Sequence, residues 1–223
     1  AGVSRRLKED HPLNFDRAAK DIQQAEVMEL LSDHITENTK ITTGVGNHQM
    51  FAAQHLMTLT PKSFITSGGY GTMGFSLPAA IGAQYANPEA TIISIDGDGS
   101  LLMNLGELFT IGKYELPVKV LLLNNHGDCM VRNIQDLMYH GSYVGTKKVT
   151  SVSFANVAGE LGFRFARRVE NRDDLKASLK EFVEADGPSF LEVVTDVDEM
   201  LYPRIPAGLG YKDMILGPHM EKE

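Results

Sequence analysis

Apolar residues along the chain follow two alternating patterns, which predict strands and helices in turn. Short runs of apolar and β-branched residues predict six strands, at about 41–43, 63–66, 91–95, 118–123, 163–169 and 189–195. Between these runs apolar positions recur at helical spacing, most clearly over 173–185, and a Gly-Pro pair then marks the stop. A first helix is expected over 22–37, where Val27 and Ile35 fall on the same face.

Two of the predicted strands, 91–95 and 118–123, are apolar along most of their length, which indicates burial on both faces. Because helical segments alternate with strands, we expect an α/β fold with a doubly wound, mainly parallel six-stranded sheet and helices on both faces. Ligands of such sheets lie beyond the carboxyl ends of the strands. The polar loops that follow the strands are therefore the place to look for chemistry.

The domain organisation is expected to be simple. Residues 1–20 are polar, carry Pro12 and show no sustained periodicity, so we interpret them as a linker remnant from a preceding domain. Residues 21–200 would form one folded domain, and 201–223 a Gly- and Pro-rich C-terminal tail over its surface. The first residue is Ala1 and not Met, which suggests a chain that was processed or cut from a longer one.

Composition and charge exclude several classes of function. Lys and Arg number 21 against 29 Asp and Glu, and the net charge of −8 without a dense basic run argues against nucleic-acid partners and anionic membrane surfaces. No apolar stretch approaches the roughly 20 residues that a bilayer span needs. The single cysteine, Cys129, excludes an intramolecular disulfide and suits a reducing compartment.

The strongest chemical signal lies at the ends of two consecutive predicted strands. Gly97-Asp98-Gly99 follows one of them and Asn124-Asn125 ends the next. One carboxylate, one carboxamide and a backbone carbonyl suit Mg²⁺ bound together with a diphosphate, and the flanking glycines let backbone N–H groups approach a phosphate. Taken singly, Asp98 could be the cap of a helix that starts near Leu101, and the Asn pair could be a turn. Together they favour the metal site.

This pair of motifs resembles the signature of thiamine diphosphate (ThDP) enzymes. The surrounding sequence is similar to the C-terminal ThDP-binding domain of the acetohydroxyacid synthase (acetolactate synthase) catalytic subunit, from about Pro12 to the end. The stretches that carry the resemblance are TTGVGNHQM at 42–50, ITSGGYGTMGFSLPAAIGA at 65–83, and Asn124-Asn125 through MVRNIQ at 130–135. The resemblance implies the ThDP-binding fold for the predicted α/β domain.

The resemblance also implies roles for individual residues. Asp98, Asn125 and the backbone carbonyl of Gly127 would hold Mg²⁺. The cofactor would contact Gly46, Asn47, His48, Gly71, Met73, Gly97, Asp98, Gly99, Ser100, Met103, Asn125 and Met130. Among these the catalytic set is Met73, Met130 and Gly71: Met73 would wedge between the cofactor rings, the Gly71 carbonyl would hold the 4′-amino group, and Met130 would line the active-site wall beside Met103.

The chain departs from the family pattern at several places. Asn47 stands where the family usually has Gln, and Cys129 replaces a usual Gly, which we interpret as a small buried apolar residue. On the substrate side Ile134 stands in place of a usual Trp, and we expect a weaker preference for 2-oxobutyrate over pyruvate. The glutamate that activates ThDP would come from the N-terminal pyrimidine-binding domain of a neighbouring subunit, so we expect this chain alone to be inactive.

For the complete enzyme the resemblance implies a homodimer or tetramer, a possible regulatory subunit, and FAD that this portion does not bind. The reaction would decarboxylate pyruvate and condense it with a second 2-oxo acid, giving acetolactate or acetohydroxybutyrate in branched-chain amino acid biosynthesis. The compartment would be cytoplasmic in a bacterium, and the plastid or mitochondrion in a eukaryote.

Three other readings of the sequence stay open. The chain could be the diphosphate-binding subunit of a split ThDP-dependent 2-oxo acid decarboxylase, or a detached domain that serves as a regulatory or assembly module. The glycines at 69, 71 and 74 also fit the dinucleotide-binding pattern, with Asp96 as the acid for the ribose of NAD. That reading leaves Asp98 and Asn125 without a purpose, and we disfavour it.

Overall fold

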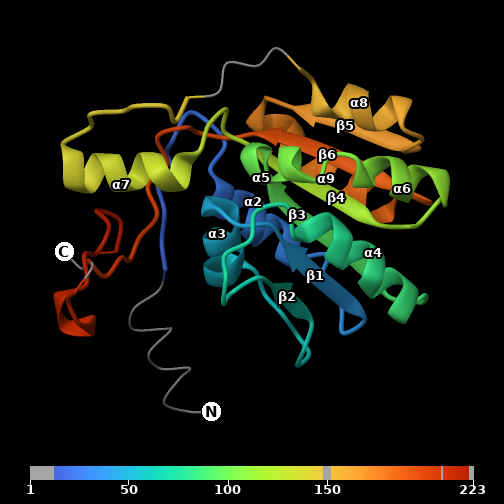
Figure 1. The fold of residues 1–223 in the computed structure, drawn as a ribbon, viewed down its shortest axis with the longest axis horizontal. Helices are drawn as coiled ribbons and strands as arrows, with labels where there is room; N and C mark the ends of the chain where they lie inside the picture. Colours follow the sequence, from blue (N-terminus) through green and yellow to red (C-terminus); the bar gives the residue numbers. More distant parts are fainter. Residues whose placement is uncertain (1–12, 148–151, 207, 221–223) are drawn as a thin grey trace.

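The computed structural model of the chain describes residues 13–147, 152–206 and 208–220, and its centre is a six-stranded sheet in the order β2-β1-β3-β4-β6-β5 (Figure 1). Every neighbouring pair of strands is parallel. The strands are β1 (Thr39–Thr43), β2 (Phe64–Thr66), β3 (Thr91–Gly97), β4 (Lys119–Asn124), β5 (Phe165–Val169) and β6 (Ser189–Val194). The six apolar runs and the parallel, doubly wound sheet predicted from them are thus confirmed.

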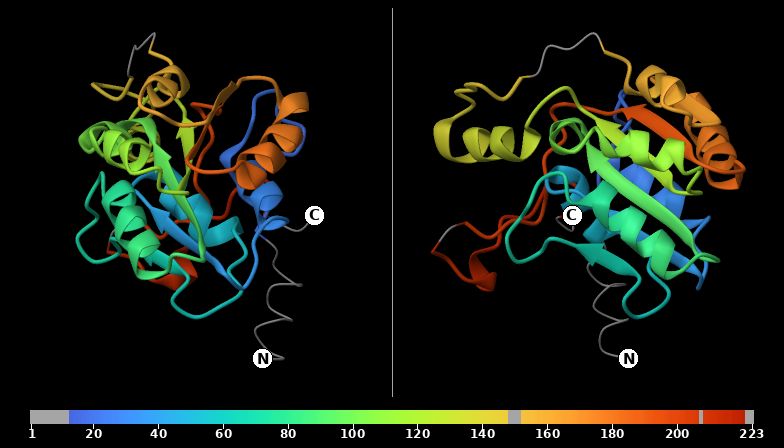
Figure 2. Two further views of the ribbon diagram at one scale, coloured as in Figure 1. Left: turned by 90° about the vertical axis from the view of Figure 1, so that its right-hand side faces the viewer. Right: turned by 45° about the vertical axis from the view of Figure 1, so that its right-hand side comes forward.

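Helices cover both faces of the sheet, and alternate strand residues feed two separate cores (Figure 2). In β3, for example, Ile93 and Ile95 join one core while Ile92 joins the other. The first core is closed by α2 (Gln24–Ser32), α3 (Asn47–His55) and α9 (Arg172–Glu184). The second is closed by α4 (Ser76–Ala86), α5 (Asp98–Met103), α6 (Glu107–Lys113) and α8 (Phe154–Glu160). Strands buried on both faces explain the near-continuous apolar runs.

The first helix is shorter than the periodicity predicted. The expectation of a helix over 22–37 is wrong, because α2 runs only from Gln24 to Ser32. The Ser32 hydroxyl donates to the Met28 carbonyl and accepts the Met57 N–H, and the backbone then tightens, with the His34 N–H donating to the Leu31 carbonyl. Ile35 still packs against the core, but from the turn that follows the helix.

The end segments of the described chain are partly tied to the domain. Phe15 is buried in the first core, and the Arg172 guanidinium donates to the Ala19 and Arg17 carbonyls. Residues 1–12 of the predicted linker lie outside the described residues. In the tail, Leu201 and Gly217 are buried, and the other described residues after 203 are exposed or half-buried. The tail contains one short 3₁₀ turn, η1 (Tyr211–Asp213).

The strand order has a switch point between β1 and β3. From β1 the chain continues outward to β2, and from β3 it continues in the other direction to β4. Diverging connections leave a crevice at the carboxyl ends of the two strands, which is where ligands of such sheets bind. Beyond β4, α7 (Cys129–Tyr139) extends away from the sheet beside this crevice (Figures 1 and 2). Within the described residues, no helix is long and apolar enough to cross a membrane.

Candidate functional site

A cavity of about 230 Å³, which we call the switch-point cavity, opens at the carboxyl ends of β1, β3 and β4. It gathers most of the site residues predicted from the sequence, although they come from four separate loops. Those that line it are Gly46, Asn47, His48, Met73, Gly97, Asp98, Gly99, Ser100, Met103, Asn125, Gly127 and Met130. The parallel strands β3 and β4 are hydrogen-bonded neighbours, so the segments after Gly97 and Asn124 emerge side by side, as the two motifs required.

Two predicted site residues do not line this cavity. Gly71 lies on the exposed loop between β2 and α4 and has a left-handed φ of +64°. Ile134 lies on α7, where 38% of its surface is exposed. Neither position is brought to the cavity by the described residues alone, and both roles stay predictions.

The loop after β1 presents buried polar groups that other described residues leave unsatisfied. Asn47 is 3% exposed, yet neither its Nδ2 nor its Oδ1 has a hydrogen-bond partner there. Burial lowers the pKa of His48 to about 3, although a hydrogen bond with the Gly44 backbone opposes the shift. His48 is therefore neutral at physiological pH, and its 3.5 Å approach to Asp96 Oδ1 is not an ion pair. Orphaned buried donors that line a cavity fit an oxygen-rich ligand such as a diphosphate.

The loop after β3 forms the first turn of α5. This helix begins at Asp98 after the N-cap Gly97, so the alternative in which Asp98 caps a helix that starts near Leu101 is wrong. A Cβ on Gly97 would lie 2.6 Å from His48 Nδ1, which leaves only a glycine room between the two loops. The Ser100 hydroxyl accepts the Gly74 N–H at 2.9 Å and the Val45 N–H at 3.4 Å. Because that hydroxyl is engaged by protein, a cofactor contact of Ser100 would fall to its backbone N–H.

Asp96 is buried and does not line the cavity, and no role in a ThDP site is predicted for it from the sequence. Its carboxylate accepts hydrogen bonds from the Ser76 hydroxyl and, at 3.0 Å, from the Gly97 N–H. Burial raises its pKa to about 6, against the lowering effect of hydrogen bonds from Ser100, Ser76 and Gly97. A Cβ on Gly44 would overlap this carboxylate. Asp96 therefore joins the first residue of α4 to the end of β3, and Gly44 after β1 packs directly against it.

The same contacts weigh against the dinucleotide alternative. The glycine pattern at 69–74 follows β2, which is an edge strand away from the switch point. Asp96, the acid that NAD would need, is fully buried and does not line the cavity. A ribose hydroxyl would have no access to it.

The two asparagines that end β4 have different surroundings. Asn124 Nδ2 donates to Glu192 Oε1 at 2.8 Å, and Asn124 Oδ1 accepts the His126 N–H at 3.1 Å. Asn125 is 6% exposed and lines the cavity. The turn interpretation thus describes Asn124, while Asn125 lines the cavity and its role as a metal ligand stays a prediction.

The candidate metal ligands form a mixed set. The described residues contain no group of three His, Cys, Asp or Glu side chains that could hold a metal ion. Asp98, Asn125 and the Gly127 carbonyl would supply one carboxylate and two neutral oxygens, which suits Mg²⁺ only if a diphosphate completes its shell. Gly127 is held by a backbone bridge to Lys147, and the Asp128 N–H donates to the Thr146 carbonyl at 2.9 Å.

Methionines form the apolar side of the cavity. Met73 and Met130 are half-buried, and Met103 is 61% exposed. Met130 also packs against the first core. Cys129 beside it is 3% exposed, which confirms the prediction of a small buried residue, and burial raises the pKa of its thiol to about 12.

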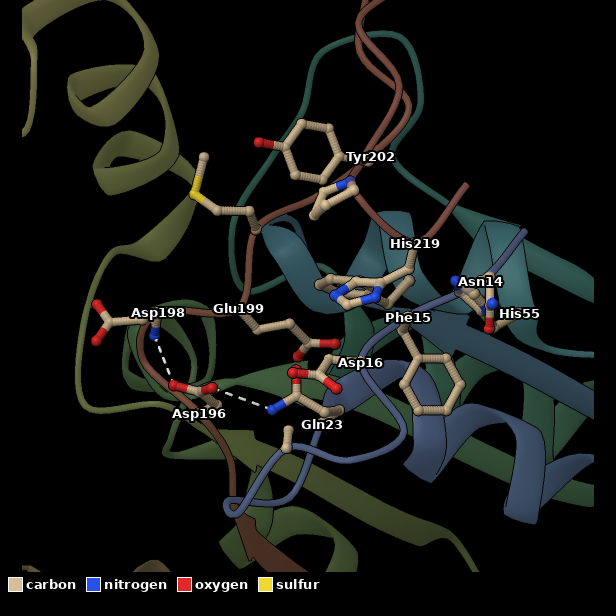
Figure 3. Close-up of a pocket in the computed structure, with 15 residues that line it drawn as sticks. Asn14, Phe15, Asp16, Gln23, His55, Asp196, Asp198, Glu199, Tyr202 and His219 are labelled. Carbon is tan, nitrogen blue, oxygen red and sulfur yellow. Dashed lines mark hydrogen bonds between the residues drawn. The ribbon is translucent and has the colours of Figure 1, made fainter. Parts of the chain in front are cut away.

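A second cavity, of about 280 Å³, contains none of the predicted site residues (Figure 3). It lies between the segment that precedes α2, the end of α3 and the tail, and Glu199 and Asp196 face it. Glu199 accepts the Gln24 N–H at 2.6 Å and the Ala25 N–H at 3.3 Å, so it satisfies the first turn of α2. Burial raises its pKa to about 8 despite these hydrogen bonds. Its contacts are those of a structural residue.

The chain is similar to acetolactate synthases from a bacterium, a plant and a yeast. It is 38% identical over 209 residues to the acetolactate synthase isozyme 2 large subunit of Escherichia coli K12, covering 94% of this chain and 38% of that protein. It is 40% identical over 215 residues to the chloroplastic acetolactate synthase 1 of Nicotiana tabacum, covering 93% of this chain and 32% of that protein. With the mitochondrial catalytic subunit of Saccharomyces cerevisiae the identity is 45% over 184 residues, covering 82% and 26% respectively.

The chain thus spans between 26% and 38% of the length of these relatives. Among protein families, residues 44–193 match the one described as thiamine pyrophosphate enzyme, C-terminal TPP binding domain, where thiamine pyrophosphate is another name for ThDP. That match includes every segment that lines the switch-point cavity except Gln24 of α2. The chain therefore belongs to the family of C-terminal TPP-binding domains of thiamine pyrophosphate enzymes.

Proposed function

We propose that this chain is the ThDP- and Mg²⁺-binding part of an acetolactate synthase. The observation that carries the proposal is the switch-point cavity, where the Asp98 and Asn125 motifs meet the orphaned polar groups of Asn47 and His48. The relatives, which bear the name acetolactate synthase, favour this activity over that of a split 2-oxo acid decarboxylase.

In this proposal the polar and apolar sides of the cavity have separate tasks. Asp98, Asn125 and the Gly127 carbonyl hold Mg²⁺, and the backbone N–H groups at the start of α5 bind the diphosphate. Asn47 and the neutral His48 complete the diphosphate contacts from the β1 side. ThDP, when bound, supplies the electron sink that allows a 2-oxo acid to lose CO₂.

The methionines orient the cofactor in this proposal. Met73 separates and bends its two rings, which is a matter of positioning rather than of side-chain chemistry. Met103 and Met130 shape the wall, and flexible thioethers suit a pocket that accommodates successive substrates. The Gly71 carbonyl, on the exposed loop between β2 and α4, holds the 4′-amino group.

A partner domain fits the exposed side of the site. On α7, which borders the cavity, Val131, Leu137 and Met138 are 48%, 36% and 63% exposed. We infer that the N-terminal pyrimidine-binding domain of a neighbouring subunit covers this side and brings the activating glutamate. The whole enzyme is then a homodimer or tetramer, with FAD bound outside this portion and with a possible regulatory subunit.

The activity would condense pyruvate, after loss of CO₂, with a second 2-oxo acid to give acetolactate or acetohydroxybutyrate. This is a step of branched-chain amino acid biosynthesis. The named relatives come from a bacterium, a chloroplast and a mitochondrion, and each of these compartments is compatible with the proposal.

Cofactor binding and product analysis test the proposal together. The longest polypeptide that the gene encodes is titrated with ThDP and Mg²⁺ by calorimetry, and acetolactate is then measured from pyruvate. Asp98→Asn removes the only carboxylate of the metal set, so we expect cofactor affinity to fall about tenfold or more. Asp128→Asn, which removes a charge at the cavity wall outside the metal set, is the matched control.

Three outcomes decide between the alternatives. Acetolactate as the product, lost in Asp98→Asn and retained in Asp128→Asn, supports the synthase. Free aldehyde as the main product indicates the decarboxylase instead. Absence of ThDP binding under all conditions contradicts both and indicates a module that retains only the scaffold.

A further inference from the structure

A carboxylate lies inside the sheet, on a central strand that is otherwise mostly apolar. Glu192 of β6 is fully buried, and β6 is flanked on both sides, by β4 and β5. A buried carboxylate is unfavourable unless several partners satisfy it. Its partners therefore indicate what the residue holds in place.

Glu192 joins three elements that are far apart in sequence. Its Oε1 accepts Asn124 Nδ2 at 2.8 Å and Arg168 Nη1 at 2.7 Å, and its Oε2 accepts the Ala155 N–H at 3.0 Å. In the sheet Arg168 pairs directly with Glu192, whereas Asn124 pairs with Val194, two residues further along the same face. Cross-strand neighbours at these positions are within side-chain reach.

Asn124 also forms a hydrogen bond within the turn at 124–127, which carries two of the candidate metal ligands. Asn124 Oδ1 accepts the His126 N–H at 3.1 Å, and His126 has a left-handed φ of +56°. The Asn124 carboxamide thus connects Glu192 at one end to the backbone between Asn125 and Gly127 at the other. These two residues are the ones that face the cavity and supply two of the three candidate Mg²⁺ ligands.

We propose that Glu192 is a positioning residue for the metal site and acts through Asn124. It contacts neither cofactor nor metal; it fixes the carboxamide that sets the backbone of the 124–127 turn. The inference rests on the proposed function, because it concerns the same Mg²⁺ site. Residues that orient metal ligands in this way commonly change metal affinity 10- to 100-fold when they are replaced.

Exchanging donor and acceptor in the hydrogen bond between Asn124 and Glu192 distinguishes a positioning role of Glu192 from a role in packing alone. In Glu192→Gln, the new amide nitrogen faces a donor whichever way the amide is turned. In one orientation it faces Asn124 Nδ2 and Arg168, and in the other it faces the Ala155 N–H. In Asn124→Asp, two carboxylates face each other. In the double variant, the new amide donates to the new carboxylate, which still accepts the His126 N–H. The amide oxygen meanwhile accepts from Ala155.

The double variant loses only the bond to Arg168. That guanidinium is held as well by Glu170, through Nε and Oε1 at 2.6 Å, so it keeps a partner. Arg168→Met, which keeps an unbranched side chain but has no N–H donor, measures separately what the loss of this bond does. Because Arg168 lies on β5 at the far edge of the sheet, we expect that control to leave metal affinity within about twofold of the unmodified protein.

The experiment measures Mn²⁺, as a paramagnetic substitute for Mg²⁺, bound with ThDP to the longest polypeptide that the gene encodes. Free Mn²⁺ is followed by electron paramagnetic resonance, and thermal unfolding is recorded for each variant. We expect each single substitution to weaken Mn²⁺ binding about tenfold or more. We expect the double variant to recover affinity to within about threefold.

Each result has a definite meaning. Single variants that unfold at lower temperature but bind Mn²⁺ normally would overturn the positioning role and leave the proposed function standing. A double variant that binds no better than either single variant would also overturn it. Failure of the unmodified protein to bind Mn²⁺ with ThDP would contradict the proposed function itself, and the positioning role with it.

Discussion

At the scale of single residues, close approach between loops decides which side chains the site tolerates. Gly44 at the end of β1 has no room for a side chain, because a Cβ would overlap both Asp96 Oδ1 and Ser100 Oγ. Both of these groups are engaged in hydrogen bonds that hold the cavity loops together. The glycine is thus fixed by the polar network beneath the cavity and not by backbone conformation.

We therefore expect Gly44→Ala to destabilise the fold by about 1–3 kcal/mol, the usual range for forcing extra volume into a packed interior. Urea denaturation followed by circular dichroism measures the change. Gly82→Ala is the matched control: Gly82 lies on the exposed side of α4 with nothing within 4 Å of a new Cβ. That control should be neutral, or stabilising by up to about 1 kcal/mol, because alanine favours a helix. Equal stability of the two variants would contradict the overlap.

At the scale of elements, α7 is the helix that borders the cavity while leaving much of its apolar surface exposed. Only Cys129 and Asn133 of this helix are buried. Asn133 Oδ1 accepts the Leu201 N–H at 2.9 Å, which links the helix to the start of the tail. Ile134 lies on the exposed part, and its predicted contact with substrate depends on a partner domain that closes over it.

Ile134→Trp tests this prediction in the complete enzyme. Competition between pyruvate and 2-oxobutyrate as the second substrate gives a ratio of acetohydroxybutyrate to acetolactate. We expect the larger aromatic wall to raise that ratio about tenfold or more, since contacts with one additional methylene are worth about 1–3 kcal/mol. Phe109→Trp, on α6 and outside the cavity, with 53% of its surface exposed, serves as the control. A ratio unaffected by Ile134→Trp would remove Ile134 from the substrate side.

At the scale of the whole molecule, buried ionisable groups link stability to pH. Burial raises the pKa of Glu199 to about 8, so the folded chain retains a proton that the unfolded chain loses near pH 4.5. Stability therefore falls as pH rises through this interval. His48 has the opposite effect, since its pKa of about 3 removes stability as pH falls below 6.5. Asp96, with a pKa raised from 3.8 to about 6, lowers stability as pH rises through that interval, and this effect is almost complete by pH 7.

Between pH 6.5 and 8 the effect of Glu199 should thus dominate. We expect the free energy of unfolding to fall by up to about 1.4 kcal/mol per pH unit in this window, and Glu199→Gln to flatten the dependence. Chemical denaturation at several pH values measures both. The replacement keeps one carbonyl acceptor, for the shorter bond from the Gln24 N–H, while its NH2 group takes the place of the oxygen that faces the Ala25 N–H at 3.3 Å. An equally steep slope in the variant would assign the pH dependence to other groups.

The sequence by itself determined the six strands and pointed to the residues that line the cavity. Apolar periodicity depends on neighbouring residues alone, so it was sufficient for the six strands and for α9. The two motifs pointed to Asp98 and Asn125 because each motif directly follows a strand, and both residues line the cavity at the carboxyl ends of the strands. The end of α2 at Ser32 was missed, since it depends on a hydrogen bond from Met57, which is distant in sequence.

Only the tertiary structure decided what supports those motifs. Asp96 and Glu192 are acidic residues within apolar strands, and nothing local distinguishes their tasks. The structure shows that each satisfies donors from elements far away in sequence, including Ser76 in one case and Asn124 and Ala155 in the other. A buried carboxylate is stable only where such donors converge, and their convergence is set by strand order and register. The motif can therefore be read from the chain, but the residues that hold it in place become visible only in the fold.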